Sequence, residues 1–172
     1  SAFDHEVYCI AGDGCMQEGV ASEASSLAAT LKLDNLFLIY DDNRITIEGE
    51  TQIAFTEDVA ARYAAYGWDV HEVDFTEGGT AYTEKVAELF ATLEAARRVT
   101  GKPHFIKVTT VIGWPLPTLA GHHSVHGSKL GGTEIAALKT ALGFDPERSF
   151  DVAPEVVAHT RTNAAERAAS AK

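Results

Sequence analysis

Short apolar segments alternate with amphipathic ones along this sequence, and this alternation restricts the fold more than any other feature. Strand-like segments lie at 7–11, 36–40, 68–73 and 104–111. Apolar residues follow helical spacing at 17–33, 56–66 and 82–98. Strands that alternate with helices predict an α/β fold: a mostly parallel, twisted sheet with right-handed crossovers and helices on both faces.

Several details of this outline can be tested against a structure. In the first helix, one apolar stripe is expected to be buried, formed by Val20, Ala24, Leu27, Ala28 and Leu31. In the second helix, Thr56 is the expected N-cap and Gly67 the expected residue after the last turn. Residues 44–55 look irregular, and 112–132 should form a long loop that returns over the sheet. We expect a partial α/β domain at 1–145 and a helical extension or linker at 146–172.

Charge and hydropathy narrow the functional classes. The 172 residues carry 14 basic and 25 acidic side chains, a net charge of −11, which disfavours nucleic acid as a partner. The longest strongly apolar run, 36–40, is too short to span a membrane, and the start has no secretory signal pattern, so a cytoplasmic location is expected. Cys9 and Cys15 are expected to be reduced thiols. An anion bound here must be held locally, by backbone N–H groups, a helix terminus or a metal.

The first strand ends at Gly12-Asp13-Gly14, immediately before the first helix. A strand, a glycine-containing turn and a helix together place free N–H groups where a phosphate can bind, and the glycines allow a close approach of the backbone. Asp-Gly turns are also common without any ligand. The triplet alone therefore leaves both a phosphate site and a plain tight turn open.

Asn43 follows the next strand, thirty residues after Asp13. The carboxyl ends of neighbouring parallel strands lie side by side, roughly 5 Å apart, so these two side chains can share one ion. Carboxylate, amide and main-chain carbonyl oxygens suit Mg²⁺ or Ca²⁺ and leave positions for phosphate oxygens and water. The implied chemistry is diphosphate binding through a divalent cation.

A Gly-Asp-Gly followed about thirty residues later by Asn is similar to the thiamine-diphosphate-binding motif. The surrounding text resembles transketolase in particular: GDGCMQEGVASEASSLAATLKLDNLFLIYDDNRITIEG, then EDVAARYAAYGW, VIGW, HHSVHGSKLGG and LGFDPERSF. The resemblance covers about Val7 to His159. It implies the latter part of a transketolase diphosphate-binding domain, with thiamine diphosphate and Mg²⁺, Ca²⁺ or another divalent cation as cofactors.

The resemblance also implies roles for individual residues of the strand ends. Asp13 and Asn43 would bind the metal through side-chain oxygens and Ile45 through its carbonyl oxygen. Gly12 and Gly14 would lie at the diphosphate, which Gly14 binds through its N–H, and Ile47 would pack against the cofactor. From pattern alone, Ile45 and Ile47 could equally be buried strand residues.

Two glutamates and one histidine complete the implied site. Glu18 and Glu23 match glutamates of a proton-sharing network between the two active sites of the family's dimer; Glu18 counts among the cofactor-site residues. Without the resemblance, an acidic residue in a first helical turn needs no function, since the helix dipole favours it. His126 matches a catalytic histidine that reaches the diphosphate and the reacting sugar. His122 and His123 are close by, but no Cys or acidic side chain accompanies them, so zinc is disfavoured.

By the same resemblance, the chemistry is transfer of a two-carbon ketol unit from a ketose phosphate to an aldose phosphate. The family's pyrimidine-binding domain comes from the partner subunit of a homodimer, and nothing in these residues matches it. We therefore expect a piece of the enzyme that is inactive alone. Trp114-Pro115-Leu116-Pro117 departs from the family's smaller residues and puts the sugar preference in doubt. The alternatives are a dihydroxyacetone synthase fragment, which uses formaldehyde, and a non-catalytic α/β binding module.

Overall fold

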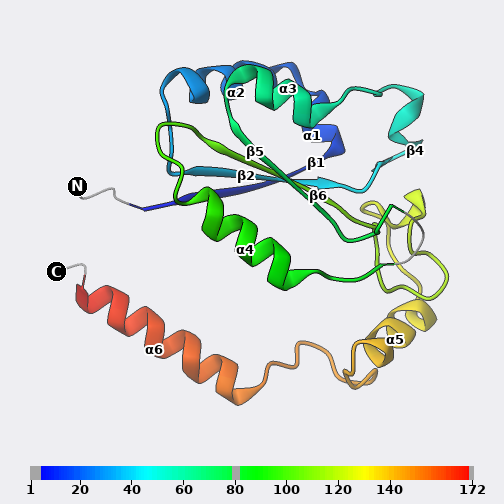
Figure 1. Cartoon of the computed structure of the whole chain (residues 1–172). Helices are drawn as coiled ribbons and strands as arrows, with labels where there is room; N and C mark the ends of the chain where they lie inside the picture. Colours follow the sequence, from blue (N-terminus) through cyan, green and yellow to red (C-terminus); the bar gives the residue numbers. More distant parts are fainter. Residues whose placement is uncertain (1–4, 79–81, 171–172) are drawn as a thin grey trace. The chain divides into compact units, whose positions relative to one another are not determined.

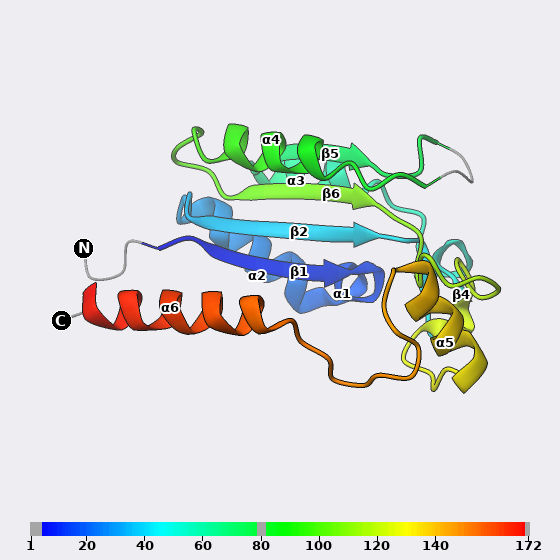
Figure 2. The same cartoon turned by 90° about the horizontal axis from the view of Figure 1, so that it is seen from below.

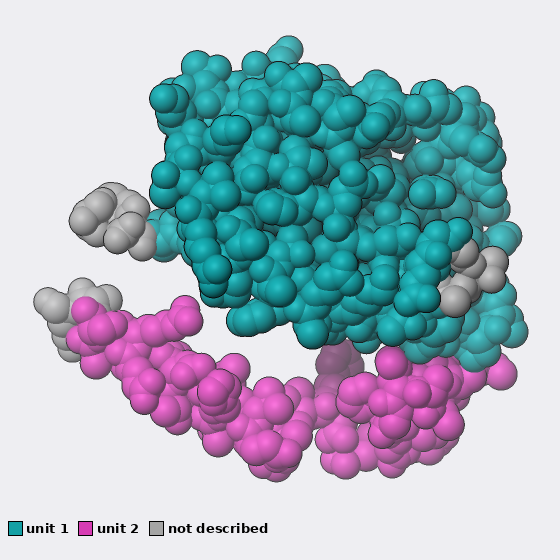
Figure 3. All heavy atoms as spheres, viewed as in Figure 1, with its two compact units in different colours: residues 1–130 teal, residues 131–172 magenta. Residues whose placement is uncertain are grey.

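The computed structural model describes residues 5–78 and 82–170. The chain divides into two compact units, residues 1–130 and 131–172, which Figure 3 colours separately. The predicted boundary after residue 145 falls inside the second unit and stays a prediction. The candidate site described below lies in the first unit.

A four-stranded sheet forms the centre of the first unit. Its strands are β1 (Val7–Gly12), β2 (Leu36–Asp42), β5 (Asp69–Asp74) and β6 (His104–Thr109). They lie in the order β1-β2-β6-β5, and every pairing is parallel. All four strands therefore end at the same edge of the sheet (Figure 2). The predicted parallel α/β fold is confirmed.

Helices cover both faces of this sheet, and each face has its own core. On one face lie α1 (Asp13–Gln17), α2 (Gly19–Thr30) and α3 (Val59–Tyr66); α4 (Val86–Ala96) covers the other (Figure 1). The first core is rich in aromatic rings: the Tyr63 and Phe105 rings stack with centroids 4.0 Å apart. The second core is built around Phe37 and Ile106. Burial of these rings fixes the position of α3 against the sheet.

The buried face of α2 differs from the predicted one. Val20, Leu27 and Leu31 are between 57% and 68% exposed, while Ser25 and Ala28 are buried. Small side chains let the helix approach the sheet closely, and the Ser25 hydroxyl is accommodated because it donates a hydrogen bond to the Tyr63 hydroxyl (3.0 Å). The predicted stripe is therefore right for Ala28 and wrong for its three large apolar side chains, which face outward while Ser25 is buried.

Two helix starts also differ from the prediction. Asp58, not Thr56, is the N-cap of α3, because its carboxylate accepts a hydrogen bond from Ala61 N (2.9 Å). The helix expected from residue 82 begins at Val86. At the other end of α3 the prediction is confirmed: Gly67 has a left-handed backbone (φ 98°), which glycine adopts without steric cost.

The segment after β2 is more regular than expected. Strands β3 (Ile45–Thr46) and β4 (Gly49–Glu50) form a short antiparallel ribbon, followed by the 3₁₀ turn η1 (Thr51–Ile53). The segment 110–130 includes the 3₁₀ turn η2 (His123–Val125). Its Gly121 lines the same cavity as Asn43 and Ile45, so this loop lies beside the strand ends; the predicted return over the sheet stays a prediction.

The second unit contains α5 (Gly132–Ala141) and α6 (Pro154–Ser170). Gly143, which follows the last turn of α5, has a left-handed backbone (φ 79°). Residues 171–172 of the predicted C-terminal extension lie outside the described residues. Within residues 5–78 and 82–170, no helix has the length and apolar character needed to span a membrane.

Candidate functional site at the carboxyl ends of the strands

The turn after β1 is tighter than the sequence suggested. Gly12 is still extended (φ −97°, ψ −176°), and α1 begins at the next residue, Asp13, rather than near residue 17. Glu18 returns to an extended backbone (ψ 132°) and separates α1 from α2. Gly14 thus lies in the first turn of α1, where backbone N–H groups have no partner within the helix. An added Cβ at Gly14 would meet no heavy atom within 4 Å, so the space beside this backbone is open.

Strand register brings Asp13 against the end of β2. Gly12 pairs with Asp41, and Ala11 pairs with Tyr40. The Asp13 side chain is only 3% exposed. Its Oδ1 accepts a hydrogen bond from the Tyr40 hydroxyl (2.7 Å), and its Oδ2 accepts one from Arg44 N (3.1 Å). The carboxylate is therefore fixed between the turn after β1 and the segment after β2.

Asp13 and Asp42 are both buried, but only one of them has a cation beside it. Asp42 lies 3.5 Å from Lys107 Nζ and 4.0 Å from Arg44 Nε. Among the described residues no Lys, Arg or His forms an ion pair with Asp13. Burial raises the pKa of the Asp13 carboxyl; the hydrogen bond from Tyr40 lowers it, and the negative charge of Asp42 raises it further. Burial and the nearby Asp13 also raise the pKa of Tyr40, which keeps its proton.

The two other predicted metal ligands, Asn43 and Ile45, lie in the segment that follows Asp42 at the end of β2. Asn43 is half-buried; its Oδ1 accepts a hydrogen bond from Ile45 N (3.0 Å), and its Nδ2 donates one to Asp41 Oδ2 (3.3 Å). Ile45 is 9% exposed, in β3. Asn43 and Ile45 line a cavity of about 360 Å³. Asp13 lines a neighbouring cavity of about 420 Å³, and Arg44, Thr51 and Gln52 line both.

These residues fit a hard divalent cation. The described residues contain no group of three or more His, Cys, Asp and Glu side chains placed to hold a metal. The predicted set is of another kind, with one carboxylate, one amide oxygen and one main-chain carbonyl. Such oxygens suit Mg²⁺ or Ca²⁺, provided that phosphate and water complete the shell. A carboxylate has about four lone-pair positions, so Asp13 can still accept a further interaction beside its hydrogen bonds from Tyr40 and Arg44 N.

The remaining predicted site residues lie at the surface. Gly14, Glu18, Ile47 and His126 are exposed. Ile47 is 68% exposed in the turn between β3 and β4, so the alternative of a buried strand residue holds for Ile45 and fails for Ile47. His126 follows η2, and the neighbouring His122 accepts a hydrogen bond from Ser124 N. Asp13, Asn43 and Ile45 lie at the strand ends and line the two cavities described above. The exposed residues line neither cavity: Gly14, Glu18, Ile47 and His126.

Three further residues belong to the site although no motif in the sequence marks them: Tyr40, Asp42 and Lys107. All three line the cavity of Asp13. A signal was available, because residues two apart on a strand share a face, and Tyr40 and Asp42 are so related at the end of β2. Pairing of β2 with β6 places Lys107 opposite Tyr40, which a single sequence does not reveal.

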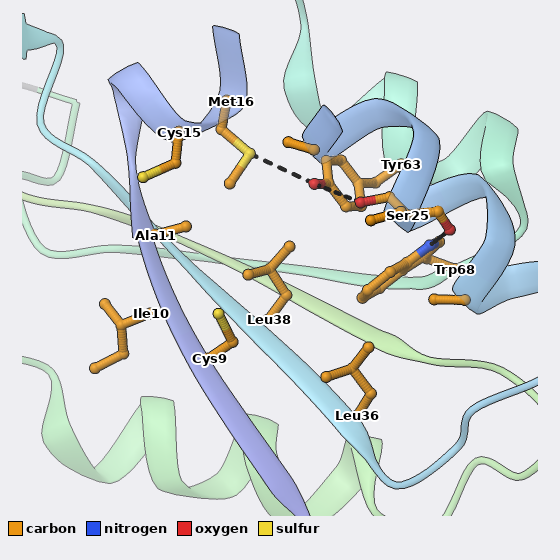
Figure 4. Close-up of a pocket in the computed structure, with 13 residues that line it drawn as sticks. Cys9, Ile10, Ala11, Cys15, Met16, Ser25, Leu36, Leu38, Tyr63 and Trp68 are labelled. Carbon is orange, nitrogen blue, oxygen red and sulfur yellow. Dashed lines mark hydrogen bonds between the residues drawn. The ribbon is translucent and has the colours of Figure 1, made fainter. Parts of the chain in front are cut away.

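A third cavity, of about 320 Å³, has a different character. Figure 4 shows it between β1, β2 and the helices above them, with Leu36, Leu38, Tyr63 and Trp68 among its lining residues. Cys9 and Cys15 also line it, and both are free thiols, as predicted. Its lining is almost entirely apolar, so a charged diphosphate fits it poorly.

Comparison with known proteins agrees with the geometry of the strand ends. The family model described as "Transketolase, thiamine diphosphate binding domain" matches residues 1–172. The chain is 50% identical over 161 residues to a transketolase of Mycobacterium leprae, covering 94% of this chain and 22% of the relative. It is 49% identical over 156 residues to transketolase 1 of Saccharomyces cerevisiae, covering 91% and 22%.

Solved structures of transketolases are also similar to this chain. A transketolase of Pichia stipitis in complex with sedoheptulose 7-phosphate superimposes with a TM-score of 0.86 at 43% identity, covering 98% of this chain and 24% of that one. A Campylobacter jejuni transketolase gives 0.77 at 41% identity, covering 87% and 22%. The chain thus spans less than a quarter of the length of these relatives. It belongs to the transketolase family and corresponds to the thiamine-diphosphate-binding domain.

Proposed function

We propose that the carboxyl ends of β1 and β2 bind the diphosphate of thiamine diphosphate through a divalent cation. One observation carries this proposal: Asp13 is a buried carboxylate for which the described residues supply no cation. Removing a carboxylate from water without a partner is costly, and a bound dication would offset that cost. The match to a thiamine-diphosphate-binding family supports this cofactor.

Each predicted residue then has a defined task. Asp13 and Asn43 would hold Mg²⁺, Ca²⁺ or a similar ion through side-chain oxygens, and Ile45 through its carbonyl. Gly12, where an added Cβ would meet no heavy atom within 4 Å, would lie at the diphosphate, and the N–H of Gly14 would donate to a diphosphate oxygen. Ile47 is exposed and so is available for packing against the cofactor. Glu18 and His126, also exposed, are available to a partner chain and a substrate.

The reaction we propose for the complete protein is transfer of a two-carbon ketol unit between sugar phosphates. Bound thiamine diphosphate supplies the carbanion chemistry, and the protein supplies binding and orientation. The pyrimidine side would come from a partner subunit or from a further part of the protein, in a homodimer. The names of solved relatives mention xylulose 5-phosphate and fructose 6-phosphate, which supports sugar phosphates as the substrate class. The cytoplasmic location stays a prediction.

Calorimetry tests the cofactor assignment directly. Thiamine diphosphate is titrated into the purified protein with Mg²⁺ and again with EDTA, and the association state is measured in parallel. We expect binding with Mg²⁺ and none with EDTA. Binding that is equally strong in EDTA would contradict the metal site, and a failure to bind even with a chain carrying the pyrimidine domain would contradict the cofactor.

His126 offers a second test, in the assembled enzyme. The change His126→Ala should lower turnover by roughly 10²-fold or more, because a positioned acid–base group contributes about that much. Thiamine diphosphate affinity should change far less. Steady-state kinetics and calorimetry on the same preparation measure the two effects, and the reverse ranking would remove the substrate role of His126.

A further inference from the structure

The Tyr40 hydroxyl lies between two buried carboxylates. It is 2.7 Å from Asp13 Oδ1 and 3.4 Å from Asp42 Oδ1. A phenol has a single proton to donate, so it can form only one strong hydrogen bond as a donor. The distances show that Asp13 receives it.

Other groups interact with Asp42, so Asp42 does not compete with Asp13 for the hydrogen bond from the Tyr40 hydroxyl. Its Oδ2 lies 3.5 Å from Lys107 Nζ and 3.4 Å from the Thr109 hydroxyl. Lys107 is itself held by Glu72, at 3.2 Å. Because Asp42 has these partners on β6, the Tyr40 proton remains directed at Asp13.

The Tyr40 ring is anchored well enough to fix the direction of that hydrogen bond. It is 3% exposed and belongs to the core under α1 and α3, with the Phe105 ring centroid 6.0 Å away. The other Asp13 oxygen is held by Arg44 N. With the Tyr40 hydroxyl on one oxygen and backbone N–H groups of the segment after β2 on the carboxylate as well, the orientation of the Asp13 carboxylate is fixed.

We propose that Tyr40 is a positioning residue, whose hydroxyl orients the Asp13 carboxylate for a Mg²⁺ ion. This inference rests on the proposed function. Mg²⁺ requires nearly ideal octahedral geometry, whereas Ca²⁺ tolerates variable coordination and longer bonds. Groups that hydrogen-bond to a metal ligand from behind set its orientation and tune the affinity of the site. Loss of the Tyr40 hydroxyl should therefore impair Mg²⁺ binding more than Ca²⁺ binding.

The test is Tyr40→Phe, which removes the hydroxyl and keeps the ring. Apparent affinities for Mg²⁺ and for Ca²⁺ are measured by calorimetry, through metal-dependent binding of thiamine diphosphate. We expect the Mg²⁺ affinity to fall by about tenfold or more, the Ca²⁺ affinity to fall clearly less, and the Mg²⁺/Ca²⁺ ratio to shift accordingly.

Tyr63→Phe is the matched control. Tyr63 lies in the same core and its hydroxyl also has buried partners, accepting from Ser25 and lying 3.6 Å from Met16 Sδ. This change should leave both affinities as in the wild type. Equal losses for both metals, or no loss, in Tyr40→Phe would overturn the positioning role alone. Absence of binding by the wild type would instead overturn the proposed function, and the role of Tyr40 with it.

Discussion

A carboxylate lies at each end of the sheet, half-buried Asp69 at the amino end and buried Asp13 at the carboxyl end, and their surroundings differ. At the amino end, Asp69 Oδ2 lies 2.8 Å from His71 Nε2 and 3.1 Å from His104 Nδ1. Burial raises the pKa of Asp69, but hydrogen bonds from the two histidines outweigh it, so the pKa lies below its usual value. At the carboxyl end, the pKa of Asp13 lies above its usual value because burial dominates. Among the described residues, Asp69 is paired with two histidines, whereas Asp13 forms no ion pair.

The largest expected effect is on binding at the carboxyl end. Asp13→Ala should reduce metal-dependent thiamine diphosphate affinity by more than about 100-fold, because the only carboxylate of the ligand set is lost. The free energy of unfolding should change by less than about 1 kcal/mol, because removal of an unfavourably buried charge offsets the loss of the hydrogen bonds from Tyr40 and Arg44 N. Calorimetry with Mg²⁺ and urea unfolding measure the two quantities, and unchanged cofactor affinity would refute the metal assignment.

Asp69→Ala should give the opposite result. It leaves Nδ1 of the fully buried His104 without its partner, which should lower the free energy of unfolding by about 2–3 kcal/mol. Metal-dependent binding should persist, because Asp69 is at the far end of the strand from the site. Urea unfolding of both alanine variants makes the comparison. If Asp13→Ala were as destabilising as Asp69→Ala, the proposed contrast between the two ends would be wrong.

The smallest expected effect is a difference in how the free energy of unfolding depends on pH, measured in metal-free protein. The folded-state pKa of Asp69 is lowered, so its contribution to stability is present above the unfolded-state value of about 3.9 and is lost as the pH falls through the folded-state value. The stability gap between wild type and Asp69→Asn should therefore narrow on acidification. Asp13 has a raised pKa, so its ionisation opposes folding as the pH rises. As the pH rises, Asp13→Asn should therefore become more stable relative to the wild type, whereas Asp69→Asn should become less stable. A pH dependence of the same sign for the two variants would contradict this.

Much of this architecture could be predicted because it depends on periodicity and topology. Alternating segments gave the parallel sheet, and parallel strands must end together, so Asp13 was correctly expected near Asn43. The burial of Ser25 on α2 could not be predicted, because it depends on a hydrogen bond to Tyr63, a residue 38 positions away. Ile47 is exposed because the chain turns back between β3 and β4. The ion pair of Asp42 with Lys107 depends on a strand pairing that no local pattern encodes.

The order of the strands also determines when the site can become rigid during folding. The β1–α–β2 segment is local in sequence and can place Asp13 beside Tyr40 early. The neighbour on the other side of β2 is β6, and their paired residues Asp42 and Thr109 are 67 positions apart. Contacts of such long range close late, because the entropy of the intervening loop must first be overcome. Two residues of β6 are therefore expected to take their places late in folding: Phe105, which packs near the Tyr40 ring, and Lys107, which pairs with Asp42. During synthesis of the chain, we expect Asp13 to be held only loosely until β6 has paired with β2.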